Sequence, residues 1–214
     1  GRAPLRLNRQ VNNLTLQEER DNKIWQQVRL SEYLNQLPVS QFCLENVEAD
    51  DIISYLVQNK RTRDYQKIII SSDKDFFQLC DEETIIYRPI QNEIITKGVL
   101  TTKYGIHPTN FALARAIVGD TSDNLPGIRG VGLKTVAKNF EFLCENKQYD
   151  LEDIIDVCKD QDNPKSSHTN IMFGKEIIAE NYDMMQLYAP DISYTNKKSI
   201  DYNIVNFEPE FNKL

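Results

Sequence analysis

The spacing of apolar residues along the chain predicts alternating helices and strands. Apolar side chains recur at helical spacing over residues 18–37, and Pro38 ends that run. Residues 39–44 form a short strand candidate. Residues 68–70 are all isoleucine, and such an unbroken apolar run is typical of a strand buried on both faces of a parallel sheet. These elements indicate an α/β fold.

The second half of the chain is predicted to be mostly helical. Residues 83–88 and 93–96 first form a strand and a hairpin return across Asn92. Thr109 is the expected N-cap of one of the helices that follow. No periodicity is clear after Tyr188. Helices are expected over residues 97–104, 109–118, 132–146, 150–159 and 169–182.

The charge balance narrows the possible functions. The net charge of −7 argues against a nucleic-acid coat protein held by bulk positive charge. It does not exclude a nucleic-acid enzyme, because carboxylates that hold metal ions count as negative. The basic residues are clustered in a few segments. For binding to a phosphate backbone, such a local cluster of positive charge matters more than the net charge of the chain. The clusters are Arg2, Arg6 and Arg9 in an acid-free start, and the basic residues within 60–67 and 129–138.

Cysteine and histidine usage argues against a zinc site. The four cysteines show no C-x-x-C spacing and there are only two histidines, so reduced, buried thiols are expected. The sequence contains no signal peptide and no apolar run long enough to span a bilayer. We therefore expect a cytoplasmic protein.

Acidic residues gather at three strand ends or helix starts. They are Glu48, Asp50 and Asp51 before one helix, Asp73 and Asp75 after the isoleucine strand, and Asp120 and Asp123 in a later loop. Acids in a first helical turn also favour the helix dipole, so capping is the structural alternative. That alternative is strongest for Asp73 and Asp75, which could cap a helix beginning at Phe76. Three acids within four residues at Glu48, however, exceed what capping needs.

Seven carboxylates predict divalent metal ions. Mg²⁺ prefers oxygen ligands and takes only a few carboxylates directly, so seven acids suit two ions better than one. Two ions about 4 Å apart can activate a water and stabilise the leaving oxygen of a phosphodiester. Without metal, such a cluster would repel itself.

A glycine-rich stretch over residues 119–140 predicts a clamp for phosphates next to the metal site. Glycines let the backbone approach a bulky partner, and a helix beginning near Gly132 would offer free N–H groups. Lys134, Thr135 and Lys138 would add side-chain phosphate contacts. A nucleotide-binding P-loop fits less well because Leu133 displaces the lysine by one place. A helix–turn–helix used only for packing is the remaining alternative.

These motifs resemble those of the 5′-nuclease (flap endonuclease) family, which includes phage 5′→3′ exonucleases and the 5′-nuclease domain of bacterial DNA polymerase I. The matching stretches are residues 47–51 (VEADD), 72–76 (SDKDF) and 119–135 (GDTSDNLPGIRGVGLKT), in the family's order and spacing. The resemblance implies that Glu48, Asp50, Asp51, Asp73, Asp75, Asp120 and Asp123 hold two Mg²⁺ or Mn²⁺ ions. Within this set we expect Asp51, Asp73, Asp75 and Asp120 to be catalytic.

The resemblance also implies how DNA is held. Residues 127–138 would form a helix–hairpin–helix unit that grips duplex DNA through its backbone and can bind K⁺ through main-chain carbonyls. The expected DNA contacts are Gly127, Arg129, Gly130, Gly132, Lys134, Thr135 and Lys138. Arg2, Arg6 and Arg9 would belong to the arch through which the 5′ strand passes.

The implied fold is α/β, with a mainly parallel sheet between helices in a PIN-like 5′-nuclease core and a helix–hairpin–helix extension. Residues 1–100 would be the C-terminal part of the nuclease core, with an arch remnant at 1–17. Residues 101–183 would be the helical DNA-binding region, and 184–214 a C-terminal tail. The family's first strand, its terminal Asp and the arch lysine have no counterpart in this sequence. We therefore expect an N-terminal segment of roughly 80 residues to be missing and the chain to be inactive alone.

The leading hypothesis is a metal-dependent 5′-nuclease that acts as a 5′→3′ exonuclease or flap endonuclease in replication or repair. Its partners would be DNA with a 5′ flap or a 5′ end at a duplex junction, and RNA–DNA hybrids, with no membrane and a monomeric state. A non-catalytic DNA-junction-binding module is one alternative. A PIN-type ribonuclease is another, although the glycine clamp argues against it.

Overall fold

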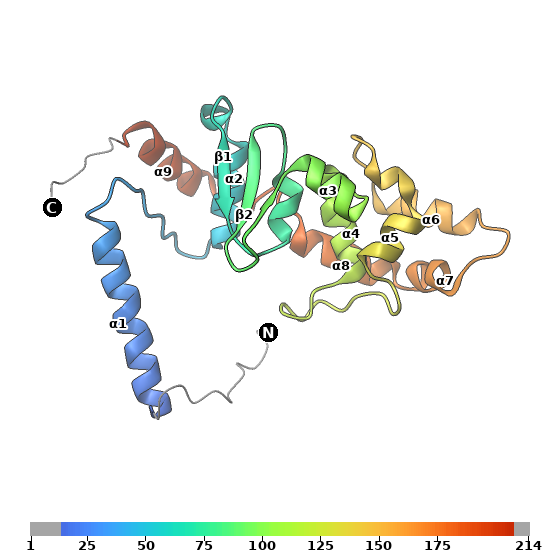
Figure 1. Ribbon diagram of the computed structural model, residues 1–214, viewed down its shortest axis with the longest axis horizontal. Coiled ribbons are helices and arrows are strands. Elements are labelled where there is room, and N and C mark those ends of the chain that lie inside the picture. Colours follow the sequence, from blue (N-terminus) through green and yellow to red (C-terminus); the bar gives the residue numbers. More distant parts are fainter. Residues whose placement is uncertain (1–13, 208–214) are drawn as a thin grey trace. The chain divides into compact units, whose positions relative to one another are not determined.

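The computed structural model describes residues 14–207, which fall into two compact units. The first unit is Glu48–Asp191 and carries the sheet and most of the helices (Figure 1). The second unit contains described residues 14–47 and 192–207. Arg2, Arg6 and Arg9, predicted to contact DNA, lie outside the described residues.

The sheet of the first unit has three strands in the order β1-β2-β3: Lys67–Ile70, Thr84–Arg88 and Glu93–Ile95. β1 and β2 are parallel, whereas β2 and β3 are antiparallel. The sheet is therefore mixed, and the prediction of a mainly parallel sheet is wrong for the described strands. The reason is the short return predicted at Asn92, whose left-handed backbone (φ 49°) reverses the chain into β3.

The isoleucine strand is less buried than predicted. Ile69 is 6% exposed, but Ile68 and Ile70 are 56% and 70% exposed. Side chains alternate between the two faces of a strand, so Ile69 packs into the core while Ile68 and Ile70 share the opposite, exposed face. Burial on both faces was the wrong prediction for this unit.

The first unit contains α-helices and several 3₁₀ turns besides its sheet. The α-helices are α2 (Ala49–Gln58), α3 (Lys97–Tyr104), α4 (Phe111–Val118), α5 (Leu133–Asn139), α6 (Leu151–Lys159), α7 (Ser166–Phe173) and α8 (Lys175–Met185). The 3₁₀ turns are η1 (Lys60–Thr62), η2 (Asp75–Leu79), η3 (Pro108–Asn110) and η4 (Glu141–Cys144).

Three predicted helices differ in detail. Thr109 is not an N-cap; its backbone N–H donates to the ring of His107, which caps η3. The helix predicted to reach residue 146 ends at Asn139, because Phe140 leaves helical geometry (φ −131°, ψ 65°) and buries its ring. The helix predicted over 169–182 is divided at Gly174 into α7 and α8.

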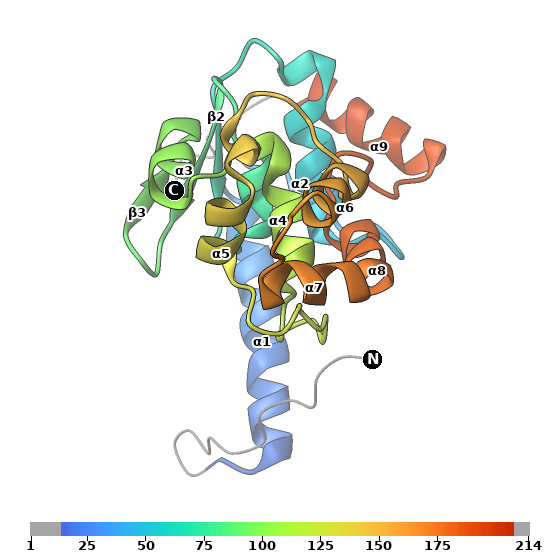
Figure 2. The ribbon, with the colours of Figure 1, turned by 90° about the vertical axis from the view of Figure 1, so that its right-hand side faces the viewer.

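Helix α4 is the centre of the helical part. Every residue from Phe111 to Ile117 is buried, and the helix packs against α5 and α8 (Figure 2). Phe111 also packs its ring against Phe77 of η2 and Tyr104 of α3, with ring centroids 5.2 and 5.7 Å apart. Aromatic contacts of this kind fix the end of α4 relative to η2. Both of these elements carry site residues.

The second unit contains one predicted helix and one that was missed. α1 (Leu16–Leu34) confirms the helix expected over 18–37; it begins at a capping box between Thr15 and Glu18, and none of its residues is buried. Residues 39–44, expected to be a strand, pair with no strand among the described residues. α9 (Tyr194–Val205) had no predicted counterpart, because its polar residues mask the helical period.

Two expectations from composition can be compared with the described residues. Cys80 and Cys158 are buried as expected, whereas Cys43 is exposed. Between residues 14 and 207, no helix is both long and apolar enough to cross a bilayer.

Candidate metal centre

A cavity of about 680 Å³ in the first unit collects most of the predicted acids. We call it the carboxylate groove. Its acidic lining residues are Glu48, Asp50, Asp51, Asp73, Asp75, Asp123, Asp183 and Asp191. No lysine or arginine is among the described residues that line it. Such an all-oxygen donor set suits hard divalent cations.

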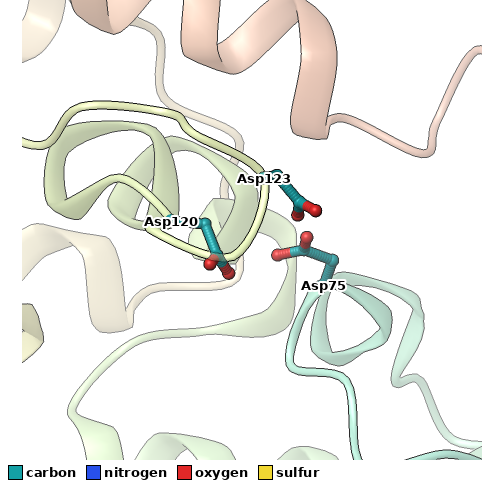
Figure 3. Close-up of side chains that lie close together, drawn as sticks. All are labelled: Asp75, Asp120 and Asp123. Carbon is teal, nitrogen blue, oxygen red and sulfur yellow. The ribbon is translucent and has the colours of Figure 1, made fainter. Parts of the chain in front are cut away.

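Three acids lie close enough together to share one ion. Asp75, Asp120 and Asp123 each offer a carboxylate oxygen, and these oxygens lie within 4.8 Å of one another. Figure 3 shows Asp75 at the start of η2, facing Asp120 and Asp123 on the loop that follows α4. Acids separated by some 45 residues of sequence thus converge on one point.

The side chain of Glu48 does not cap α2. Glu48 is the N-cap residue of α2, yet its side chain makes no capping hydrogen bond. Asp73, by contrast, is partly used locally: its Oδ1 accepts the N–H of Asp75 at 2.9 Å. This bond holds the turn after β1. The capping alternative therefore fails for Glu48, and η2 likewise begins after Lys74 without a side-chain cap, so Asp73 holds the preceding turn instead.

The loop with Asp120 and Asp123 is folded tightly against the end of α4. Asp120 and Leu125 exchange two backbone hydrogen bonds, of 2.9 and 2.8 Å. A Cβ on Gly127 would lie 1.7 Å from the carbonyl oxygen of Val118, and Gly119 has φ +75° beside the backbone of Gly127. Both glycines are required by this close approach within the protein. Gly127, predicted to contact DNA, thus has a clear internal role.

A buried asparagine fastens both ends of this loop. Asn181 of α8 is 2% exposed, and its side-chain amide donates to the carbonyls of Ala116 and Pro126, both at 2.9 Å. These two carbonyls flank the segment that carries Asp120 and Asp123. Asn181 therefore couples the loop to α8, whose end lines the carboxylate groove.

Arg115 is a cation of the site that was not predicted from the sequence. Its Nε donates to Asp75 at 2.9 Å, and its second terminal nitrogen forms a short ion pair with Asp120. The Arg115 side chain is only 8% exposed. It therefore links the two acids that the chain brings together from separate segments.

The carboxylates have unequal pKa values. Burial, together with the charges of Asp73 and Glu48, raises the pKa of Asp50 to about 6. Burial also raises the pKa of Asp75, although Arg115 opposes the shift. Burial acts in the same sense on Asp120, but hydrogen bonds from Ser122 and Arg115 outweigh it and lower its pKa. Protons and divalent cations therefore compete most directly at Asp50.

Two acids of the groove were missed from the sequence. Asp183 lies in the last turn of α8, and Asp191 ends the first unit. Both are isolated acids far along the chain from the three clusters, so neither belongs to a recognisable motif. Only the folding of α8 beside the loop places them at the groove.

The predicted phosphate clamp is largely exposed. Arg129, Lys134 and Lys138 are exposed, and Thr135 is half-buried. Gly130 has φ +78°, and a Cβ on Gly130 or Gly132 would meet no atom within 4 Å. The turn before α5 thus presents an open backbone.

Comparison with known proteins shows that this chain is similar in sequence to 5′-3′ exonucleases. Residues 9–105 match the family described as 5′-3′ exonuclease, N-terminal resolvase-like domain. A 5′-3′ exonuclease of Buchnera aphidicola is 35% identical over 115 residues, which cover 53% of this chain and 40% of that protein. A 5′-3′ exonuclease of Aquifex aeolicus is 40% identical over 92 residues, covering 43% and 32%. The chain thus spans less than half the length of these curated relatives.

Solved structures show the same fold. T5 5′-exonuclease with bound divalent zinc superposes with a TM-score of 0.71 at 19% identity, covering 91% of this chain and 73% of that one. A T5 D15 flap endonuclease complex with DNA and metal ions gives a TM-score of 0.70 at 17% identity, covering 91% and 72%. The resemblance to 5′-nucleases is confirmed, and the described chain has a T5 exonuclease-like fold.

Arg115→Met should make stability depend on divalent ions. Without metal, Asp75 and Asp120 would face each other without a cation, and we expect the free energy of unfolding to fall by about 3 kcal/mol. Added Ca²⁺ or Mn²⁺ should restore much of this loss, because the ions would neutralise the same carboxylates. Urea unfolding in EDTA and in Ca²⁺ measures both values.

Arg129→Met is the matched control for this variant, because Arg129 is exposed and makes no ion pair among the described residues. It should change stability little in either condition. An equal loss for Arg115→Met with and without Ca²⁺ would contradict the role of Arg115 as the neutralising cation.

Proposed function

We propose that this chain, a relative of the 5′-3′ exonucleases, carries the metal centre of a 5′-nuclease that hydrolyses phosphodiester bonds of DNA. The observation that carries the proposal is the convergence of acids from three segments on one groove without a lysine or arginine in its described lining. Structural roles such as helix capping would not bring Asp75, Asp120 and Asp123 within 4.8 Å of one another.

The residues fit two divalent ions. Asp75, Asp120 and Asp123 would hold one, and Glu48, Asp50, Asp51 and Asp73 supply oxygens for a second in the same groove. Bound Mg²⁺ or Mn²⁺ would supply an activated water and stabilise the leaving oxygen. The protein's own part is to hold these carboxylates in place through Arg115 and the tight loop after α4. No side-chain nucleophile is needed.

The substrate we propose is DNA with a 5′ flap or a 5′ end at a duplex junction. The support is relatedness to 5′-3′ exonucleases, together with a T5 flap endonuclease of the same fold that was solved with DNA and metal ions. A hybrid of an RNA primer with DNA has the same backbone chemistry at the cut.

The exposed turn before α5 is proposed as the duplex clamp. Lys134 and Lys138 are four residues apart on α5, so they share one face of the helix. Ile128 and Val131 anchor the turn in the core, and Asn170 of α7 donates to the carbonyl of Arg129 at 3.1 Å. A turn held firmly from below can present Gly130 and the lysines to a phosphate backbone.

Within the complete enzyme, Asp73→Asn should abolish cleavage of a 5′-flap duplex while leaving binding in Ca²⁺ nearly intact. Loss of a direct metal ligand should lower the rate by on the order of 10³-fold. Gel-resolved turnover in Mg²⁺ and in Mn²⁺ measures the effect. Asp64→Asn, an exposed acid outside the groove, is the control and should cleave as the parent does. Retention of even about a tenth of parental turnover by Asp73→Asn would contradict the assignment.

Lys134→Ala and Lys138→Ala should weaken binding to every duplex sequence alike. Each lost phosphate contact should reduce the slope of log affinity against log salt by about 0.9. Discrimination between base sequences should not change, since phosphate contacts carry no sequence information. Fluorescence anisotropy over a salt series measures the slope. A variant that binds as the parent does at every salt concentration would remove that lysine from the clamp.

A further inference from the structure

A second cavity, of about 520 Å³, adjoins the carboxylate groove. Its lining includes Ser72 and Lys74 from the turn after β1, Arg115 from α4, and Thr121 from the following loop. Asp73 and Ser122 line both cavities, so the two meet along these residues. Unlike the groove, this cavity contains cations. We call it the Lys74 pocket.

The two cationic side chains that line the Lys74 pocket differ in whether they form an ion pair within the described part of the protein. Arg115 forms ion pairs with both Asp75 and Asp120. Lys74 is half-buried and, among the described residues, has no carboxylate within ion-pair distance, although it stands between Asp73 and Asp75 in sequence. A half-buried ammonium group that the protein leaves without an anion is available to an external one.

The Lys74 pocket also contains negative charges, and we expect it to bind an anion only when divalent ions neutralise them. Asp73 and Asp120 also line it, and in the free protein their charges oppose an entering anion. Both belong to the proposed metal centre, where divalent ions would neutralise them. A phosphate would then meet the ammonium group of Lys74 and the hydroxyl of Thr121 beside the metal-bound phosphate.

We propose that the Lys74 pocket binds a phosphate group of the substrate strand next to the one being cleaved, with Lys74 as its cation. This inference rests on the proposed nuclease function and deepens it, because it assigns a phosphate subsite on one side of the carboxylate groove. The subsite would fix the strand's register, so that one particular phosphodiester reaches the ions.

The test replaces single phosphates of a 5′-flap duplex by neutral methylphosphonate linkages and measures binding in Ca²⁺. For the parent, one position flanking the cleavage site should weaken binding about tenfold, the loss of one charge-assisted contact. In Lys74→Gln, methylphosphonate at that same position should weaken binding about twofold or less. Lys74→Arg should again show the parental loss of about tenfold at that position. The slope of log affinity against log salt should fall by about 0.9 in Lys74→Gln.

Lys67→Gln is the matched control. Lys67 is also half-buried and without an ion pair among the described residues, but it lies at the other end of β1 and donates to the carbonyls of Thr62 and Tyr65. It should keep the parental methylphosphonate pattern and slope. Thermal unfolding of both variants in EDTA should match the parent, which separates binding from folding.

Two results would overturn the assignment. If methylphosphonate at every position weakens DNA binding by Lys74→Gln as much as it weakens binding by the parent, Lys74 contacts no phosphate of the strand. If Lys67→Gln lowers the salt slope equally, Lys74 adds only to the general charge. Failure of the parent itself to bind junction DNA would instead refute the proposed function.

A competition experiment distinguishes a phosphate within the strand from a terminal phosphate. Thymidine 5′-monophosphate is added as the competitor. Displacement of DNA from the parent but not from Lys74→Gln supports the subsite as a general phosphate site.

Discussion

The mutual repulsion of the clustered carboxylates is the constraint on which the site depends. Like charges held within a few ångströms destabilise a fold unless a cation or a proton neutralises them. Here Arg115 pairs with both Asp75 and Asp120, and Asp50 has its pKa raised to about 6. A single buried guanidinium thus offsets the repulsion between Asp75 and Asp120 before any divalent ion binds.

The scaffold holds these charges by packing rather than by flexible loops. The segment after α4 is closed by the backbone pairing of Asp120 with Leu125, and the contact of Gly127 with Val118 admits no side chain. Asn181 then ties the segment to α8 with two buried hydrogen bonds. These attachments hold ligands from distant parts of the sequence at a fixed spacing in the structure, as a metal site requires.

Local chemistry could be predicted from the sequence, whereas long-range placement could not. The acids at Glu48, Asp73 and Asp120 stood out because motifs and strand ends mark them. Arg115 was missed because an arginine within an apolar helix has no distinguishing pattern. Asp183 was missed for the same reason; its role depends on how α8 folds back.

The fold errors have similar causes. Burial of the isoleucine strand was overestimated because the sequence alone cannot show that the face of β1 with Ile68 and Ile70 is exposed. The strand expected over residues 39–44 found no partner among the described residues, and a strand needs one. α9 was missed because its polar composition hides the helical period, although Ser193 is a regular N-cap.

Locating divalent ions in crystals of the protein tests the central claim most directly. Anomalous diffraction from crystals soaked in Mn²⁺ should show an ion bound by Asp75, Asp120 and Asp123, with a second in the carboxylate groove. The distances from ion to oxygen should be about 2.1 Å. Mn²⁺ bound elsewhere, with no ion at these three carboxylates and with Asp75 and Asp120 still paired to Arg115, would contradict the account.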